Sequence, residues 1–192
     1  CVLPFRVDTR TANEAVESWV HSRWFAPNAF KKYKETGSLA SVYAAYFTYD
    51  AETSTQYRGQ RGDTYTVTVG SGDNRRTEVR VRWSNRSGTV RDSFDDLAVL
   101  ANTGLDRKRV TALEPWPTHE ARPFTQQYVA GHLCRTYDHD AEECFGEAKR
   151  RMDEQITQTV KRDIGGDQQR IHAKQTTFHT LGRVKAAGGD DE

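Results

Sequence analysis

Two stretches of alternating residues on either side of a turn cluster constrain the fold of this chain more than any other feature. Residues 64–69 alternate threonine with tyrosine or valine, and residues 77–84 alternate apolar with charged side chains. Between them, residues 70–74 (Gly-Ser-Gly-Asp-Asn) are typical of a tight turn. The apolar side chains of the second stretch are Val79, Val81 and Trp83, and the charged ones are Glu78, Arg80 and Arg82. A period of two predicts β-strands, so this region predicts an antiparallel hairpin.

Further strand patterns extend this hairpin into a sheet. Aromatic residues within 41–50 favour a strand before the hairpin. After it, residues 85–88 (Asn-Arg-Ser-Gly) predict another turn, followed by a short strand at Val90 and an apolar stretch over 94–100. Together these patterns predict an antiparallel β-meander.

Helical patterns flank the predicted sheet on both sides. The 3.6-residue spacing predicts a helix over 8–25, a short second helix over 27–35, one or two helical turns over 106–113, and a long helix over 141–162. Gly165-Gly166 ends the long helix, and 169–180 predicts a final strand. The chain is therefore predicted to be α+β, with N-terminal helices, an antiparallel β-meander, one long C-terminal helix and a final strand. We expect a single domain over residues 1–180 and a mobile polar tail over 181–192.

Composition excludes several classes of protein. The chain has 192 residues, with 28 Lys and Arg against 27 Asp and Glu, so its net charge of +1 produces no global attraction to nucleic acid or an anionic membrane. No run of about 18 apolar residues is present, so no transmembrane segment is predicted. Three cysteines do not suggest a disulfide framework, and the cytoplasm is the expected location.

A cluster of arginines is the first candidate binding site. It consists of Arg75, Arg76, Arg80, Arg82, Arg86 and Arg91. Arginine on a sheet, with Tyr57 and Trp83 nearby in sequence, is suited to contacting phosphates and stacking bases. The alternative is a solvated sheet face that charge protects against edge pairing.

A group of potential zinc ligands is the second candidate site. It consists of His132, Cys134, His139 and Cys144. Nitrogen and sulfur ligands are those that zinc prefers, but the spacing matches no common ligand pattern. The alternatives are small buried thiols beside surface histidines, or a Cys134–Cys144 disulfide.

Acidic residues provide a weaker third candidate. Asp95 and Asp96 are adjacent, and neighbouring residues of a strand point to opposite faces, which argues against a shared divalent cation. Tyr49-Asp50 and the segment Phe94-Asp95-Asp96 are nevertheless candidates for carboxylates at one end of the sheet. Residues 163–167 favour a helix stop over a phosphate loop. No Gly-x-Ser-x-Gly or His-Glu-x-x-His pattern occurs, so enzyme activity is not expected, although it stays open.

Several segments together resemble a known family. They are residues 2–8, 24–28, 46–51, 57–62, 82–83, 87–90, 94–97, 113–116 and 163–171. Over residues 2–178, the chain resembles a bacterial zinc-ribbon protein family often labelled "primosomal protein N-prime (replication factor Y), superfamily II helicase". The resemblance implies Cys-x-x-Cys zinc ribbons before the Leu-Pro-Phe segment and a further apolar strand pair after the last strand, and this chain carries neither.

The same resemblance bears on individual residues. It implies ordinary, non-ligand roles for the positions of Cys134, His139 and Cys144. No Walker A lysine or Asp-Glu-x-His box is present, so helicase activity is not implied for this chain. Among the matching residues, Gly59, Gly62 and Gly88 are predicted to occupy turns that need a positive φ.

These observations leave three hypotheses for function. The first is a non-catalytic binding or scaffold module in a larger bacterial assembly, with a protein partner or self-assembly completing a sheet edge. The second is a nucleic-acid-binding module that uses the arginine-rich hairpin. The third is an enzyme of unknown chemistry. No cofactor is expected, with zinc as the open alternative.

Overall fold

The computed structural model describes residues 1–22, 40–179 and 185–187. The chain groups into two compact units, one formed by residues 1–47, 100–141 and 185–192 and the other by residues 48–99 and 142–184. Two compact units can belong to one folding domain, so the single domain over 1–180 stays a prediction. The helix expected over 27–35 lies outside the described residues, whereas Lys185–Ala187, inside the expected tail, form a strand, β6.

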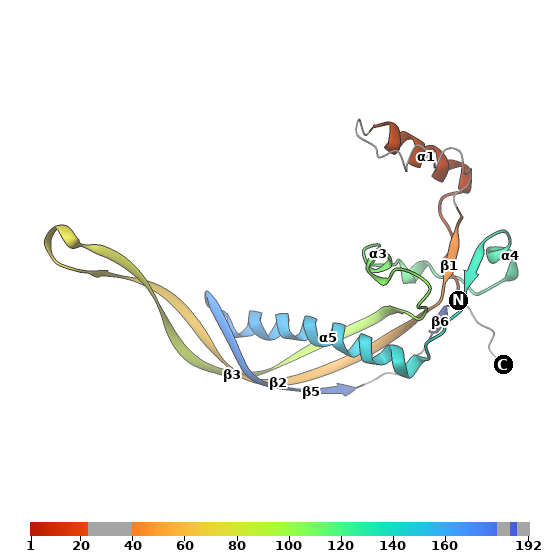
Figure 1. The fold of residues 1–192 in the computed structure, drawn as a ribbon. Coiled ribbons are helices and arrows are strands. Elements are labelled where there is room, and N and C mark those ends of the chain that lie inside the picture. Colours follow the sequence, from red (N-terminus) through yellow and green to blue (C-terminus); the bar gives the residue numbers. More distant parts are fainter. Residues whose placement is uncertain (23–39, 180–184, 188–192) are drawn as a thin grey trace. The chain divides into compact units, whose positions relative to one another are not determined.

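An antiparallel sheet and one long helix build the second unit (Figure 1). The strands are β2 (Tyr46–Val69), β3 (Arg76–Leu100) and β5 (Gln168–His179), in the order β3-β2-β5. The short turn η1 (Gly72–Asn74) joins β2 to β3 in a hairpin, and β5 pairs antiparallel with residues 52–62 of β2. β6 pairs with β2. The predicted α+β class is confirmed, including the hairpin and the final strand.

The strands are longer than the sequence predicts. The expected turn at 85–88 does not form, and β3 continues through it as one strand. Gly88 lies inside that strand. A Cβ at this position would come within 2.9 Å of the Tyr57 hydroxyl oxygen, which explains why the residue is glycine. Gly59 and Gly62 also lie in a strand, and the positive φ expected at these three glycines is absent. A glycine inside a strand often marks a close approach of this kind.

Helix α5 (Ala141–Ile164) packs on one face of this sheet. Its apolar residues recur with helical spacing, and Ala148, Met152, Ile156 and Val160 are fully buried. The sheet contributes the odd-numbered residues of β2 from 49 to 57, all buried, and Val90 and Phe94 of β3. The helix ends at Gly165 and Gly166, whose φ values of 68° and 76° do place them in the left-handed region.

Polar bonds also join α5 to the sheet. Tyr57 Oη donates a hydrogen bond to Asp163, and Thr159 Oγ1 donates one to Asp92 Oδ1 over 2.7 Å. Lys174 Nζ on β5 lies 2.6 Å from Asp153 Oδ1 of the helix.

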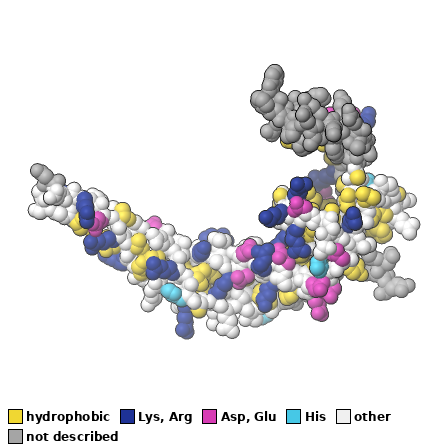
Figure 2. Space-filling model, viewed as in Figure 1, with side chains coloured by type: hydrophobic (Ala, Val, Ile, Leu, Met, Phe, Trp, Pro, Cys, Tyr) yellow, Lys and Arg dark blue, Asp and Glu magenta, His cyan; other side chains and the backbone are white. Residues whose placement is uncertain are grey.

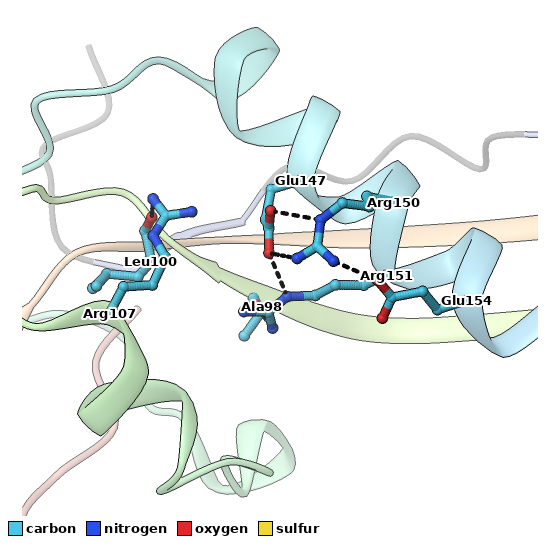
Figure 3. Close-up of polar contacts among 7 residues, drawn as sticks. All are labelled: Ala98, Leu100, Arg107, Glu147, Arg150, Arg151 and Glu154. Atoms are coloured by element: carbon cyan, nitrogen blue, oxygen red, sulfur yellow. Dashed lines mark hydrogen bonds and ion pairs between the residues drawn. The ribbon is translucent and has the colours of Figure 1, made fainter.

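Near the start of α5, an ion-pair network reaches the backbone of β3. Arg150 bonds to both Glu147 and Glu154, while Arg151 bonds to Glu147 and donates to the carbonyl oxygen of Ala98 over 3.2 Å (Figure 3). The hydrogen bonds and ion pairs of α5 thus reach β2, β3 and β5, from the start of the helix to its end. Together they hold α5 on one face of the sheet.

The first unit is built from short elements. Two short strands, β1 (Val42–Ala44) and β4 (Leu133–Arg135), pair in parallel. The helical elements are α1 (Thr9–His21), α3 (Arg107–Thr111), η2 (Thr118–Glu120) and α4 (Gln126–Val129). Asp106 caps α3 by accepting two backbone hydrogen bonds, in agreement with the helical turns expected there.

Candidate functional site

The β2–β3 hairpin extends beyond the rest of its unit and carries the predicted arginine cluster. The last register pair between β2 and β5 is Gly62 with Gln168, so residues 63–82 form a two-stranded ribbon. Where their exposure is described, residues 64–80 are all exposed or half-buried. Figure 2 shows Lys and Arg side chains along this ribbon with hydrophobic side chains between them.

Strand alternation divides the predicted arginines between the two faces of the sheet. We call the face covered by α5 the helix face and the opposite one the open face. Gly88 and Val90 of β3 face the helix, so even-numbered residues of this strand belong to the helix face. Arg76, Arg80, Arg82 and Arg86 therefore share the helix face, Arg91 lies on the open face, and Arg75 lies in the connection before β3.

The arginines of the helix face are partly neutralised. Glu78 forms ion pairs with Arg76 over 2.8 Å and with Arg80 over 3.3 Å. Arg82 stacks over the ring of Tyr65, with 5.3 Å between the guanidinium carbon and the ring centroid. Exposed ion pairs of this kind stabilise a protein by less than about 1 kcal/mol, so they hold side chains in place more than they stabilise the fold.

The open face carries two basic residues outside the predicted arginine cluster. Arg58 and Arg170 are exposed there, in addition to Arg91. The guanidinium carbon of Arg170 lies 3.8 Å from the centroid of the Trp83 ring. Beneath the indole is Gly62, where a Cβ would come within 2.9 Å of the ring. In the sequence, the spacing of two residues between Arg58 and Gln60 indicates that both lie on one face of a strand. Arg170 is distant in sequence, so no local pattern places it on the same face.

Amide side chains lie beside this stacked pair. Gln60 is in register with Arg170 on the neighbouring strand, and its Nε2 donates to Asn85 Oδ1 over 3.1 Å. Asn85, Gln60 and Arg170 thus form a polar row across the three strands. Within the part of the chain that the structure describes, the guanidinium groups of Arg58, Arg91 and Arg170 make no hydrogen bond or ion pair.

The predicted zinc ligands are not gathered into one group. His132 bonds through Nδ1 to Ser41 Oγ and packs against the rings of Phe5 and Tyr43. Cys134 is exposed on β4, Cys144 is buried in α5, and His139 is half-buried. Among residues 1–22, 40–179 and 185–187, no three of these four have ligand atoms within 4.8 Å of one another. Zinc binding by them has no geometric support.

Three carboxylates do come together. The oxygens of Asp50, Asp95 and Asp96 lie within 4.8 Å of one another, and Asp96 N donates to Asp50 Oδ1 over 2.7 Å. The expectation that Asp95 and Asp96 point apart is wrong, because Asp96 has a φ of 51° and interrupts the regular alternation. Carboxylate oxygens are the ligands that calcium and magnesium prefer, so these three residues are the candidate cation ligands.

Tyr57 is a titratable group at the interface of α5 and the sheet. Burial, followed by its hydrogen bond to Asp163, raises the pKa of the Tyr57 phenol to about 12. The neutral phenol is therefore the form that the fold stabilises. Its position among packed strand and helix residues is that of a structural link.

Comparisons with known proteins give limited similarity. No family model matches the chain, and no solved structure matches it. The chain is similar to "Uncharacterized protein YdjG" of Bacillus subtilis (strain 168), with 22% identity over 165 residues that cover 86% of this chain and 47% of YdjG. The chain thus spans about half the length of this curated relative. The resemblance to the zinc-ribbon family stays a prediction.

Within the described residues, no helix combines the length and the apolar character needed to cross a membrane.

Proposed function

We propose that this chain is a non-catalytic binding or scaffold module of a larger bacterial protein assembly, acting in the cytoplasm. The observation that supports this most is the outer edge of β3. This strand is 25 residues long and stands at the end of the order β3-β2-β5, and no strand in the described part of the chain pairs with its outer edge. An unpaired strand offers backbone donors and acceptors to a partner strand.

The test measures assembly of the full chain and its dependence on this edge. Light scattering after size exclusion is expected to show species larger than a monomer, either for the purified chain or in a native bacterial extract. Thr89→Lys adds a charge to the exposed edge strand and is expected to reduce assembly. Gln56→Lys adds the same charge to the same sheet face on the central strand and is the matched control. A monomer under all conditions contradicts the proposal.

A nucleic-acid-binding module is the second candidate, supported by the four arginines that share the helix face of the hairpin. A two-stranded β-ribbon fits the major groove of DNA, and arginine contacts both phosphates and guanine edges. Fluorescence anisotropy with labelled single- and double-stranded DNA is expected to show binding that weakens with salt. The double variant Arg80→Gln/Arg82→Gln is expected to weaken it further. No binding at low salt rejects this candidate.

A further inference from the structure

On the open face, the charged residues of β2 from residue 56 onward, of β3 up to residue 91 and of β5 are all basic. On this face β2 presents the even-numbered residues from Gln56 to Thr68, and β3 presents the odd-numbered ones from Thr77 to Arg91. Neither set contains an acidic residue, and the open face of β5 contains none either. The nearest carboxylate on this face of β2 is Glu52, which already accepts a hydrogen bond from Ser93 over 2.6 Å.

Arg170 is the best prepared donor on this face. Stacking on Trp83 fixes the plane of its guanidinium, so little side-chain freedom remains to be lost on binding. The hydrogen-bonding edges of a stacked guanidinium stay accessible, and they match the two oxygens of a carboxylate. Gln60 and Asn85 add amide groups in the same row, and Arg58 adds a second cation two residues along β2.

We propose that the open face around Trp83 and Arg170 binds an acidic peptide segment of a partner protein. The proposal rests on the proposed binding function and names the chemistry of the partner. Charge complementarity selects an anionic occupant. A peptide is favoured over a nucleic acid because the Arg170 guanidinium covers a face of the Trp83 ring, which leaves less of that ring for a base to stack on.

The experiment uses fluorescence anisotropy of the full chain with defined probes. The probes are a labelled peptide of alternating Glu and Thr, the same peptide with Gln in place of Glu, and a labelled oligothymidylate. The Glu peptide is expected to bind, and the Gln peptide is expected to bind at least about tenfold more weakly, as the loss of charge-assisted hydrogen bonds implies. Binding of oligothymidylate but not of the Glu peptide overturns the proposal.

Variants locate the site on one face. Arg170→Gln is expected to weaken binding of the Glu peptide about tenfold, and Arg58→Gln is expected to weaken it by a smaller factor. Arg80→Gln removes the same charge from the helix face of the hairpin and is expected to leave binding unchanged. Thermal unfolding checks that each variant is folded. If Arg170→Gln unfolds, Arg58→Gln against Arg80→Gln decides.

Results that contradict the acidic-peptide site can be distinguished from results that contradict the proposed binding or scaffold function. No binding of the Glu peptide at low salt, or equal weakening by Arg80→Gln and the open-face variants, overturns the acidic-peptide site. Assembly of the chain through the β3 edge is measured without any probe. It can therefore persist when the peptide site fails, and the reverse also holds.

Discussion

At the scale of single residues, the hydroxyl of Tyr57 links the sheet to α5 and makes stability depend on pH. Its pKa is raised from 10.0 to about 12, so the folded chain holds the phenolic proton more tightly than the unfolded chain. This contribution to stability is fully present below pH 10 and is lost as the pH rises from 10 to about 12. Chemical denaturation across that range is expected to show the loss.

The variant Tyr57→Phe isolates this effect. It is expected to lower the free energy of unfolding at neutral pH by about 1 to 3 kcal/mol, because a hydrogen bond to a carboxylate is removed. It is also expected to flatten the stability profile above pH 10 relative to the unmodified chain. Identical profiles for the two proteins would show that Tyr57 does not carry the dependence.

Gly88 tests the same contact from the other strand. A Cβ at this position would lie 2.9 Å from Tyr57 Oη and 3.1 Å from Asp163 Oδ2. Gly88→Ala is therefore expected to cost about 1 to 3 kcal/mol in denaturant unfolding. The cost is expected to shrink in the Tyr57→Phe background, since the hydroxyl is then absent.

Gly146→Ala provides the control for Gly88→Ala. Gly146 lies in α5 with nothing within 4 Å of an added Cβ, so alanine there is expected to stabilise by about 0.5 to 1 kcal/mol. Equal effects at both glycines would contradict the close-approach explanation.

These glycines also show what a sequence leaves undetermined. Local patterns report which residues favour turns, and Gly88 in Asn-Arg-Ser-Gly matches a turn by that criterion. Glycine is required at position 88 by the side chain of Tyr57, which is 31 positions away in the chain and adjacent only in the folded sheet. The same limit applies to Arg170 and Trp83, because strand pairing alone brings them together.

At the scale of elements, α5 was predictable because its own sequence contains the cause of its position. A stripe at helical spacing, an acidic first turn and Gly165-Gly166 at the end mark its bounds within two residues. The lengths of β2 and β3 were not predictable from the sequence. Polar residues that hydrogen-bond to α5 occupy positions on the covered face, and they interrupt the alternation of apolar and polar side chains. Asp92 and Thr159 form one such pair.

Core packing under α5 gives the prediction at this scale. Ile156 is fully buried at the centre of the helix stripe. Ile156→Ala is expected to lower the free energy of unfolding by about 2 to 5 kcal/mol, through lost burial and the cavity that remains. Ile156→Val removes one methyl group and is expected to cost about 0.5 to 1.5 kcal/mol. Comparable losses from the two substitutions would argue against a tightly packed interface.

At the scale of the molecule, a net charge of +1 conceals two unlike sheet faces. The helix face of the hairpin mixes arginine with Glu78. The open face carries Arg58, Arg91 and Arg170, and it has no carboxylate on residues 56–68 of β2, 77–91 of β3 or 168–179 of β5. Composition sums over both faces, so it argues against general attraction to polyanions without excluding a local anionic partner.

Shortening the hairpin separates the ribbon from the rest of the second unit. Replacement of residues 65–80 by an Asn-Gly turn keeps the strand register and leaves Gly62, Trp83 and the β2–β5 pairing intact. None of the removed side chains whose exposure is described is buried, so the free energy of unfolding is expected to change by about 1 kcal/mol or less.

The shortened chain also distinguishes the two binding surfaces. It is expected to keep its affinity for the Glu peptide, because Arg58, Trp83 and Arg170 all remain. Any binding to DNA through the ribbon is expected to fall and to show a weaker dependence on salt, because Arg75, Arg76 and Arg80 are removed. Loss of peptide binding together with retained stability would place the peptide site on the ribbon and contradict its assignment to the open face.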